Sequence, residues 1–401
     1  MTPEVECRIV SKDRMLMQIK NRFTLKIESI AFGGSGVGRA EGLVIFVPFT
    51  APEDVVEIEI VARKKKFARG RLIRIIEPSR RRTLPLCRYY GSCGGCSYQH
   101  IDYECQLEVK QQQVQEVFSR IGAIVHPEVS DIIPSPLNYG YRGKARLHAA
   151  KKATGVRLGF MDVSGGGLVD IERCEIMDET INDQIRETRA KGINSFDDGD
   201  VTFWSGSQNH AEDAIVRVVK GREFLAPVNG FFQANLHLTG RMVDEVCRLI
   251  GAEKRDTVID ACCGSGLFSI FLAPYALRVI GVEINEKSVR YARENTKRQE
   301  IGNTEFICGD VEDVLVDMAR GKDSMDLIIL DPPRTGLSGK TIAAVSGLKL
   351  REIVYISCDP ATQARDVKIF RDNGYCMESL IPMDMFSQTE HIETIALLRR
   401  R

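Results

Sequence analysis

The sequence lacks the features that mark membrane, secreted or fibrous proteins. Its 55 basic side chains are balanced by 55 acidic ones, and hydrophobic residues make up 43% of the 401 positions, which is an ordinary globular composition. The longest predominantly apolar stretch, residues 267–277, has 11 residues and contains a proline, whereas a membrane-spanning helix requires ~20. The first residues carry charges of both signs and no apolar core, so we expect no signal peptide and a soluble, cytoplasmic protein.

The neutral total conceals an uneven distribution of charge. Residues 1–85 hold 17 Lys or Arg and 10 Asp or Glu. Within residues 61–85 there are ten basic side chains and a single acidic one. A basic module on a slightly acidic body favours a polyanionic partner bound at one end. A solvated run of charges is the plain alternative.

Short strand-like runs separated by turns occupy residues 17–78. This spacing predicts a small five-stranded barrel of the oligonucleotide-binding kind. The glycine-rich stretch between the first two runs, residues 33–42, contains GxGxG, but strand-like sequence follows it where a nucleotide fingerprint needs a helix. We therefore interpret it as a hairpin turn. The predicted contacts with a polyanion are the basic residues of this module, Lys64, Lys65, Lys66 and Arg69.

The middle of the chain is cysteine-rich at its start and strand-like afterwards. Cys87, Cys93 and Cys96 lie within ten residues, and a helix is predicted over residues 103–121 from its apolar spacing. Residues 127–232 are predicted as strands with turns, including a loop at 191–200. A disulfide framework is not expected in a cytosolic chain of this length.

From about residue 240, short apolar runs alternate with helical segments. Buried strands that alternate with helices predict a parallel, doubly wound α/β sheet. Acidic residues stand at the ends of successive runs: Asp260 before a turn with Gly264, then Glu283, Asp310 and Asp331. An acid after the second strand can bind ribose hydroxyls. Four acids in register favour a nucleoside-containing cofactor over separate helix caps.

Two further residues predict the chemistry. Cys358 lies just beyond the fifth predicted strand, where a thiolate can act as a nucleophile. Glu393 precedes the last strand, where partial desolvation would raise its pKa into a range useful for a base. A pyrimidine carbon 5 becomes nucleophilic when a thiolate adds at carbon 6, and a base must afterwards remove the carbon 5 proton. One cysteine and one carboxylate near a methyl donor satisfy this route.

These motifs resemble those of the RNA uracil-5 methyltransferase family, in its branch with an N-terminal TRAM barrel and an iron–sulfur cluster. The matching segments are FFQAN (231–235), DACCGSG (260–266), DPPRTGL (331–337), SCDP (357–360) and TEHIE (389–393). The resemblance implies a Rossmann-like domain that uses S-adenosylmethionine (AdoMet), with Cys358 as nucleophile and Glu393 as base. The implied AdoMet or substrate contacts are Gln233, Cys262, Gly264, Glu283, Asp310 and Asp331.

The same resemblance predicts three parts: a TRAM RNA-binding barrel at 17–78, a β-rich central domain with the cysteine loop at 79–232, and the methyltransferase domain at 233–401. The helix at about 103–121 is expected to pack on the last of these. The chain departs from the family at four positions. Cys262 stands where the family usually has an aromatic residue, and Leu267 stands where it often has Thr or Asn. Asp359 replaces the family's Asn, and Ser387 replaces its Pro. None removes a reacting group.

The cysteines predict a metal centre. Cys87, Cys93 and Cys96 have C-x5-C-x2-C spacing, and Cys174 is a separate candidate. Four thiolates suit zinc or an iron–sulfur cluster, and the x5 spacing is unusual for a zinc ribbon. The family resemblance implies a [4Fe-4S] cluster with Cys174 as fourth ligand. Cys105 lies in the predicted helix and is expected not to ligate.

Other functions fit the motifs less well. An RNA cytosine-5 methyltransferase would carry a second cysteine after the fourth strand, where this chain has Asp331 and two prolines. An amine methyltransferase would place an aromatic residue at Arg334. A radical AdoMet enzyme needs C-x3-C-x2-C, and a non-catalytic TRAM-type RNA chaperone would not need Cys358 and Glu393. The expected partner is RNA, ribosomal rather than transfer RNA, bound by a monomer without an obligate protein partner.

Overall fold

The computed structural model describes residues 22–152, 155–191, 199–209, 213–321 and 325–401. The first five residues of the predicted barrel, and most of the loop predicted at 191–200, lie outside this part of the chain. The chain divides into two compact units between Arg82 and Thr83, and each is considered by itself. No helix among the described residues is both long and apolar enough to cross a bilayer.

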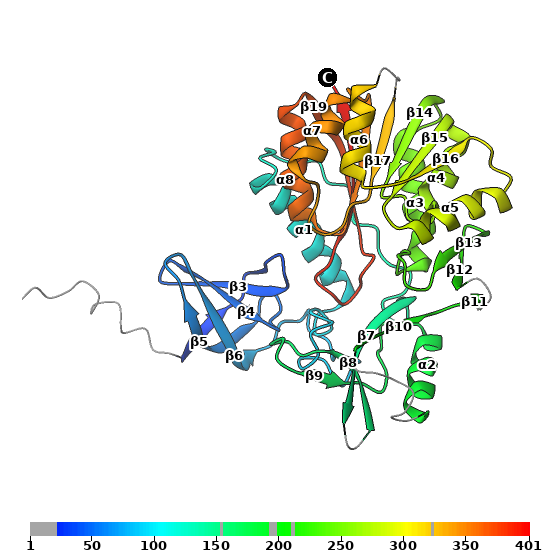
Figure 1. The fold of residues 1–401 in the computed structure, drawn as a ribbon. Coiled ribbons are helices and arrows are strands. Elements are labelled where there is room, and N and C mark those ends of the chain that lie inside the picture. Colours follow the sequence, from blue (N-terminus) through cyan, green and yellow to red (C-terminus); the bar gives the residue numbers. More distant parts are fainter. Residues whose placement is uncertain (1–21, 153–154, 192–198, 210–212, 322–324) are drawn as a thin grey trace, which may run out of the picture. The chain divides into compact units, whose positions relative to one another are not determined.

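The N-terminal unit is a curled antiparallel sheet with one parallel pair (Figure 1). Its strand order is β1-β5-β6-β4-β3-β2. Alternate side chains such as Leu25, Ile45, Val56 and Ile58 face a common apolar core, as the period of two requires. Its strands are β1 (Arg22–Lys26), β2 (Ser29–Ile30), β3 (Ser35–Ala40), β4 (Leu43–Pro48), β5 (Val55–Arg63) and β6 (Phe67–Glu77).

The interpretation of the glycine-rich stretch as a hairpin turn is wrong. Residues Ser35–Ala40 form strand β3, and the turns lie before it and at Glu41–Gly42. At Gly38 only glycine fits, because a Cβ there would lie 2.5 Å from the Lys26 carbonyl oxygen. Glycine here permits close packing of two backbones. The sheet thus has six strands rather than the predicted five: the predicted first run is divided into β1 and β2, and the predicted turn contains β3.

The second unit contains a seven-stranded sheet in the order β16-β15-β14-β17-β18-β20-β19, parallel except where β20 pairs with its neighbours. The doubly wound sheet is as predicted. The order reverses at β14, which leaves a crevice at the carboxyl ends of β14 and β17. The strands are β14 (Arg255–Ala261), β15 (Ala276–Glu283), β16 (Thr304–Cys308), β17 (Leu327–Leu330), β18 (Glu352–Ser357), β19 (Tyr375–Met383) and β20 (Glu393–Arg400).

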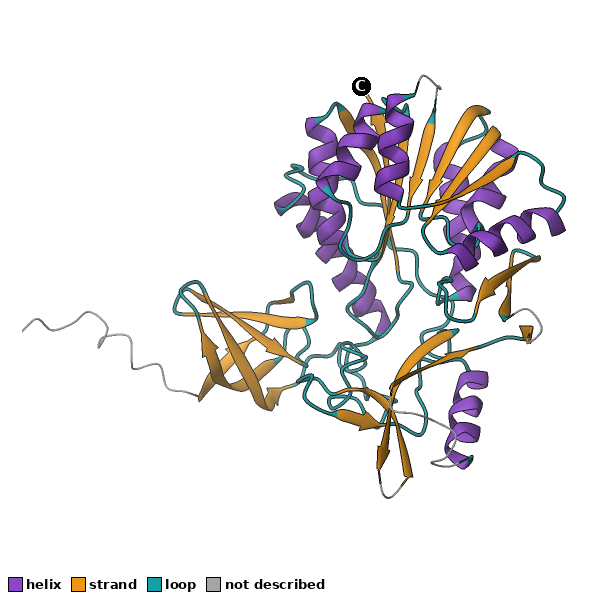
Figure 2. Ribbon diagram, in the orientation of Figure 1, coloured by secondary structure: helices purple, strands orange, loops and turns teal. Residues whose placement is uncertain are grey.

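Helices cover both faces of this sheet (Figure 2). One apolar core includes α3 and α4, and the other includes α1, α6, α7 and α8. Both cores draw on alternate residues of the same strands, so the strands are apolar on both faces. The helices are α1 (Tyr103–Arg120), α3 (Leu236–Ile250), α4 (Leu267–Leu272), α5 (Glu286–Arg298), α6 (Val311–Arg320), α7 (Gly339–Gly347) and α8 (Pro360–Asp372).

Helix α1 is an outlying part of the sequence that packs on this domain. Val114, Val117 and Phe118 lie in the same core as Phe370 of α8. Asp102 caps the helix by accepting a hydrogen bond from Cys105 N at 2.8 Å, a common N-terminal arrangement. The segment that directly follows the cysteine-rich loop is therefore fixed to the sheet that carries the predicted nucleophile.

The rest of the second unit holds two small antiparallel sheets, β10-β7-β8-β9 and β11-β12-β13. Helix α2 (Glu179–Ala190) was not predicted, because only Ile181 and Ile185 form its apolar face. Its N-cap, Asp178, accepts from Thr180 N. The strands are β7 (Lys144–Lys152), β8 (Gly155–Met161), β9 (Leu168–Asp170), β10 (Gly199–Trp204), β11 (Gln208–Asn209), β12 (Ala214–Val219) and β13 (Arg222–Pro227).

Candidate active site and cysteine pocket

The glycine-rich turn after β14 has the backbone geometry of a ligand-binding loop. Cys262, Gly264 and Gly266 all have positive φ, at 64°, 53° and 85°. A Cβ at Gly264 would meet no atom within 4 Å among the described residues, so the space above the loop is open. The loop is fixed from below by Asp260, whose buried carboxylate accepts hydrogen bonds from Ser269 N at 2.7 Å and Ser269 Oγ at 2.5 Å.

Glu283 is tied to the same loop. Its two carboxylate oxygens accept from Gly264 N at 3.1 Å and from Asn285 N at 2.8 Å. The predicted strand-end acid is thus next to the glycine turn, as parallel strands require. Asp310 differs, because it is exposed and caps α6 by accepting from Glu312 N at 2.8 Å. The contact that Asp310 makes in the structure is therefore that of a helix cap, the alternative to a cofactor contact.

Asp331 follows β17, close enough to Asp260 for the two charges to interact. Together, burial and the charge of Asp260 raise the pKa of Asp331 to about 7, against the opposing effect of a hydrogen bond from Gln233. Gln233 Nε2 donates to Asp331 Oδ2 at 3.3 Å. Burial likewise raises the pKa of Asp260 to about 6. A cation beside the Asp331 carboxylate would stabilise its charged form, and a sulfonium is one such cation.

Strand register brings Cys358 and Glu393 together. Ser357, the last residue of β18, pairs with Thr394 of antiparallel β20, so the next position on each strand places Cys358 beside Glu393. Thr394 Oγ1 fixes this end of the pair by donating to Ser357 O at 3.2 Å. Glu393 is only 3% exposed. The two residues are 35 positions apart in sequence, yet neighbours at the edge of the sheet.

The electrostatics of this pair fit a nucleophile and a base. Together, burial and the charge of Glu393 raise the pKa of the Cys358 thiol to about 11, against the opposing effect of Arg334. Burial also raises the pKa of Glu393 well above its usual range, with a contribution from Asp331. Burial thus disfavours the charged form of both groups, and Arg334 is the cation that opposes this effect at each of them.

Arg334 was not predicted as part of the site. Its place in the sequence argued only against an amine methyltransferase, but its guanidinium is near enough to lower the pKa of both Cys358 and Glu393. Its backbone is fixed because Thr362 Oγ1 donates to Arg334 O at 3.1 Å. A cation beside the cysteine stabilises the thiolate. The DPPR motif contained this signal, since it places one basic side chain three residues after a strand-end acid.

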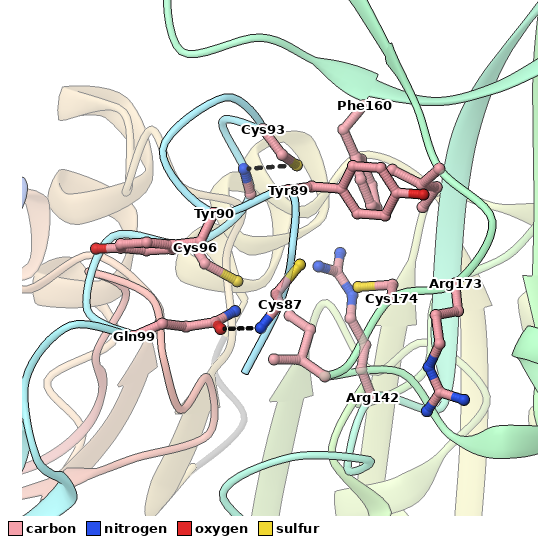
Figure 3. A pocket seen from close by; sticks show the side chains of 13 residues that line it. Cys87, Tyr89, Tyr90, Cys93, Cys96, Gln99, Arg142, Phe160, Arg173 and Cys174 are labelled. Carbon is pink, nitrogen blue, oxygen red and sulfur yellow. Dashed lines mark hydrogen bonds between the residues drawn. The ribbon is translucent and has the colours of Figure 1, made fainter. Parts of the chain in front are cut away.

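The four predicted ligand cysteines line one pocket in the second unit. Cys87, Cys93 and Cys96 come from the loop before α1, and Cys174 comes from the segment before α2. Figure 3 shows sulfur atoms of the loop and of Cys174 turned toward a common space, beside Arg142. The loop is braced by hydrogen bonds from Cys87 N to Gln99 Oε1 at 3.0 Å and from Gly95 N to Cys93 Sγ at 3.4 Å.

No disulfide joins the described cysteines. Among the described residues, no three His, Cys, Asp or Glu side chains are placed so that they could hold one metal ion. The four cysteines surround a pocket instead, whose lining contains no histidine and no acidic residue. Burial raises the pKa of Cys96 to about 12 and of Cys174 to about 11. Cys105 is buried in α1 and is not among the residues that line this pocket.

Comparisons with known proteins agree with this geometry. The model of the tRNA (uracil-5-)-methyltransferase family matches residues 211–401, and that of the TRAM domain matches residues 20–73. An RNA methyltransferase of Clostridium tetani is 30% identical over 460 residues, which cover 96% of this chain and 99% of that protein. One from Gloeobacter violaceus is 30% identical over 444 residues, covering 94% and 96%.

A solved structure resembles the whole chain. The crystal structure of Pyrococcus abyssi tRNA (uracil-54, C5)-methyltransferase in complex with S-adenosyl-L-homocysteine has a TM-score of 0.68 and 24% identity, and covers 94% of this chain and 100% of that one. At this identity the likeness concerns the fold. The combination of a TRAM domain, a doubly wound sheet and near full-length relatives shows that the chain belongs to the RNA uracil-5 methyltransferase family and is an AdoMet-dependent enzyme that acts on RNA.

Proposed function

We propose that the enzyme methylates carbon 5 of one uridine in ribosomal RNA through a covalent adduct between Cys358 and the base. The observation that carries this proposal is the β18–β20 register, which sets a cysteine and a buried carboxylate side by side at the edge where the glycine turn lies. Ribosomal RNA is proposed over transfer RNA because the family branch with a TRAM barrel and clustered cysteines favours it.

The residues divide the reaction between them. Cys358 loses its proton to solvent, helped by Arg334, and its sulfur adds to carbon 6 of uracil. Carbon 5 takes the methyl group of AdoMet. Glu393, ionised for this step, removes the proton from carbon 5, and the electron pair of that bond expels the thiolate. The products are 5-methyluridine and S-adenosylhomocysteine, with one proton released overall.

The chain's own residues fit the methyl donor. The open space above Gly264 admits a ligand close to the backbone. Glu283 can receive ribose hydroxyls, and Asp331 with Gln233 lies where a positive sulfonium would be stabilised. Asp310 stands at the next strand end, and Cys262 stands where the family carries an aromatic residue, so we expect weaker stacking at that side of the cofactor.

We also propose that Cys87, Cys93, Cys96 and Cys174 hold a [4Fe-4S] cluster. What supports it is the donor set, four cysteines around one pocket with no histidine, aspartate or glutamate among the described lining residues. Thiolates of this kind bind iron–sulfur clusters. When bound, the cluster would supply a structural cross-link between the cysteine loop and the segment before α2, and no step of methyl transfer requires it.

Loss of the protein should remove one 5-methyluridine from cellular RNA. Mass-spectrometric mapping of RNA from cells with and without the gene identifies the position. Expression of the wild-type chain should restore the modification, and Cys358→Ala should not. If transfer RNA rather than ribosomal RNA loses the methyl group, the RNA target proposed here is wrong while the chemistry stands. If no uridine changes, the activity is wrong.

The N-terminal barrel should supply affinity for phosphates. Lys64, Lys65 and Lys66 are exposed at the turn between β5 and β6, whereas nearby Arg71 and Arg74 are paired with Glu59 and Glu57. Replacing the three lysines with Gln should lower the slope of log affinity against log salt by roughly 2–3, at ~0.7–0.9 per phosphate contact. Titration of RNA at several salt concentrations measures it. An unchanged slope would exclude these lysines from the interface.

A further inference from the structure

The segment Asp384–His391 joins β19 to β20 and leads directly to Glu393. Its last residues lie within electrostatic range of Arg334. Burial raises the pKa of Glu390 and of Glu393, and the charge of Arg334 opposes both shifts. Burial and the charge of the same arginine together lower the pKa of His391 to about 4. The segment thus ends close to both Arg334 and Glu393.

The cysteine loop makes hydrogen bonds with the segment Asp384–His391. Gln388 O accepts hydrogen bonds from Ser97 N and from Tyr98 N, each at 3.0 Å. The Ser97 hydroxyl donates to Glu390 Oε2. Ser97 is the residue after Cys96, one of the four cysteines that line the pocket. The loop and the segment are nearly 300 residues apart in sequence.

Helix α1 holds the start of the segment through a buried ion pair. Lys110 Nζ lies 2.5 Å from Asp384 Oδ1, and both side chains are fully buried. Lys110 Nζ also donates to Phe386 O at 3.1 Å, and the Tyr103 hydroxyl donates to Asp384 Oδ2 at 2.8 Å. Ser387, where the family carries proline, donates to the same oxygen at 2.8 Å.

A second pair of contacts from α1 fixes the middle of the segment. Gln106 Nε2 donates to Gln388 Oε1 at 3.0 Å, and Gln388 N donates to Gln106 Oε1 at 3.1 Å. Buried backbone groups need such partners. The conformation of the segment is thus set by residues outside it as well as by its own turn, in which Thr389 Oγ1 donates to Phe386 O.

We propose that the cysteine loop and α1 position the general base, Glu393. Ser97 and Lys110 fix the segment Asp384–His391, so that the Glu393 carboxylate points at the carbon 5 proton. This rests on the role proposed for Glu393. Cys358 lies on another element, between β18 and the N-cap Asp359 of α8. Loosening the segment should therefore slow proton removal more than formation of the adduct. Ser97 and Lys110 are positioning residues: the Ser97 hydroxyl is bonded to Glu390, and Lys110 is fully buried against Asp384.

Ser97→Ala tests this with little disturbance, and Ser92→Ala, at an exposed serine of the same loop, is the matched control. We expect kcat for Ser97→Ala to fall about 5–20-fold with KM for RNA within about twofold, because adduct resolution slows. The covalent adduct should accumulate during turnover. Amides of 384–391 should exchange with deuterium faster, and iron content should match that of wild type.

Lys110→Met should show larger effects in the same direction, because it leaves Asp384 buried without its partner. If it does not fold, Tyr103→Phe removes one hydroxyl from Asp384 and should give a smaller effect of the same sign. The proposal is overturned if Glu393→Gln traps adduct but Ser97→Ala exchanges and turns over like Ser92→Ala. If Glu393→Gln traps none, the role of Glu393 is wrong, and faster exchange in Ser97→Ala then supports only the holding of the segment.

Discussion

Glu393→Gln should trap a methylated RNA that stays covalently bound to the enzyme. Glutamine keeps the shape of a side chain that is only 3% exposed, so the fold and the addition of Cys358 to carbon 6 should survive. It cannot accept the carbon 5 proton, so elimination stops. We expect turnover to fall by roughly 10²–10⁴-fold. A denaturing gel with RNA labelled through the methyl group of AdoMet shows the adduct as a slow band.

Cys358→Ala is the partner of this experiment. It should abolish both methylation and the slow band, because no sulfur is left to add to the base. The double variant should look like Cys358→Ala, since addition precedes proton removal. If Glu393→Gln turns over at the wild-type rate, or Cys358→Ala still methylates uridine, the proposed mechanism is wrong. An adduct formed better with a loop RNA than with a duplex would agree with extrusion of the target base.

Much of the site could be predicted from the sequence, because the carboxyl ends of parallel strands lie at the same edge of a sheet. Buried runs that alternate with helices place every strand end on one edge, so Glu283 and Asp331 were expected near the glycine turn. The same logic could not give the β18–β20 register, which depends on an antiparallel strand inserted between β18 and β19. That register is what sets Glu393 beside Cys358, and no local pattern encodes it.

Polar contacts over long sequence distances were beyond sequence reasoning. Helix α1 was predicted from its apolar spacing, but its lysine is fully buried against Asp384, 274 residues away. A lysine on a helix is usually exposed, so this position carried no signal. Arg334 was missed for a similar reason, because its partner Cys358 follows a different strand. The turn interpretation of 33–42 failed because glycine permits both turns and close strand packing.

The second large effect expected is on iron content. Cys174→Ala should lose most of the iron from protein purified without oxygen, although Cys174 lies 78 residues beyond Cys96 in the sequence. It shares one pocket with the three loop cysteines, and a cluster held by three thiolates is more exposed to solvent and loss. Wild-type protein should be brown and should contain iron and acid-labile sulfide in about equal amounts, as expected of a [4Fe-4S] cluster.

Cys105→Ala is the control for this loss. Cys105 is nearer to the loop in sequence, yet it lies in α1 and does not line the pocket formed by the described residues, so its replacement should leave iron and sulfide at wild-type levels. Measurement of metal and sulfide in both variants shows which cysteine is the fourth ligand: Cys105, which is closer to the loop in sequence, or Cys174, which lines the pocket. Stoichiometric zinc in anaerobically purified wild-type protein would contradict the cluster, and iron loss in Cys105→Ala with retention in Cys174→Ala would contradict the assigned fourth ligand.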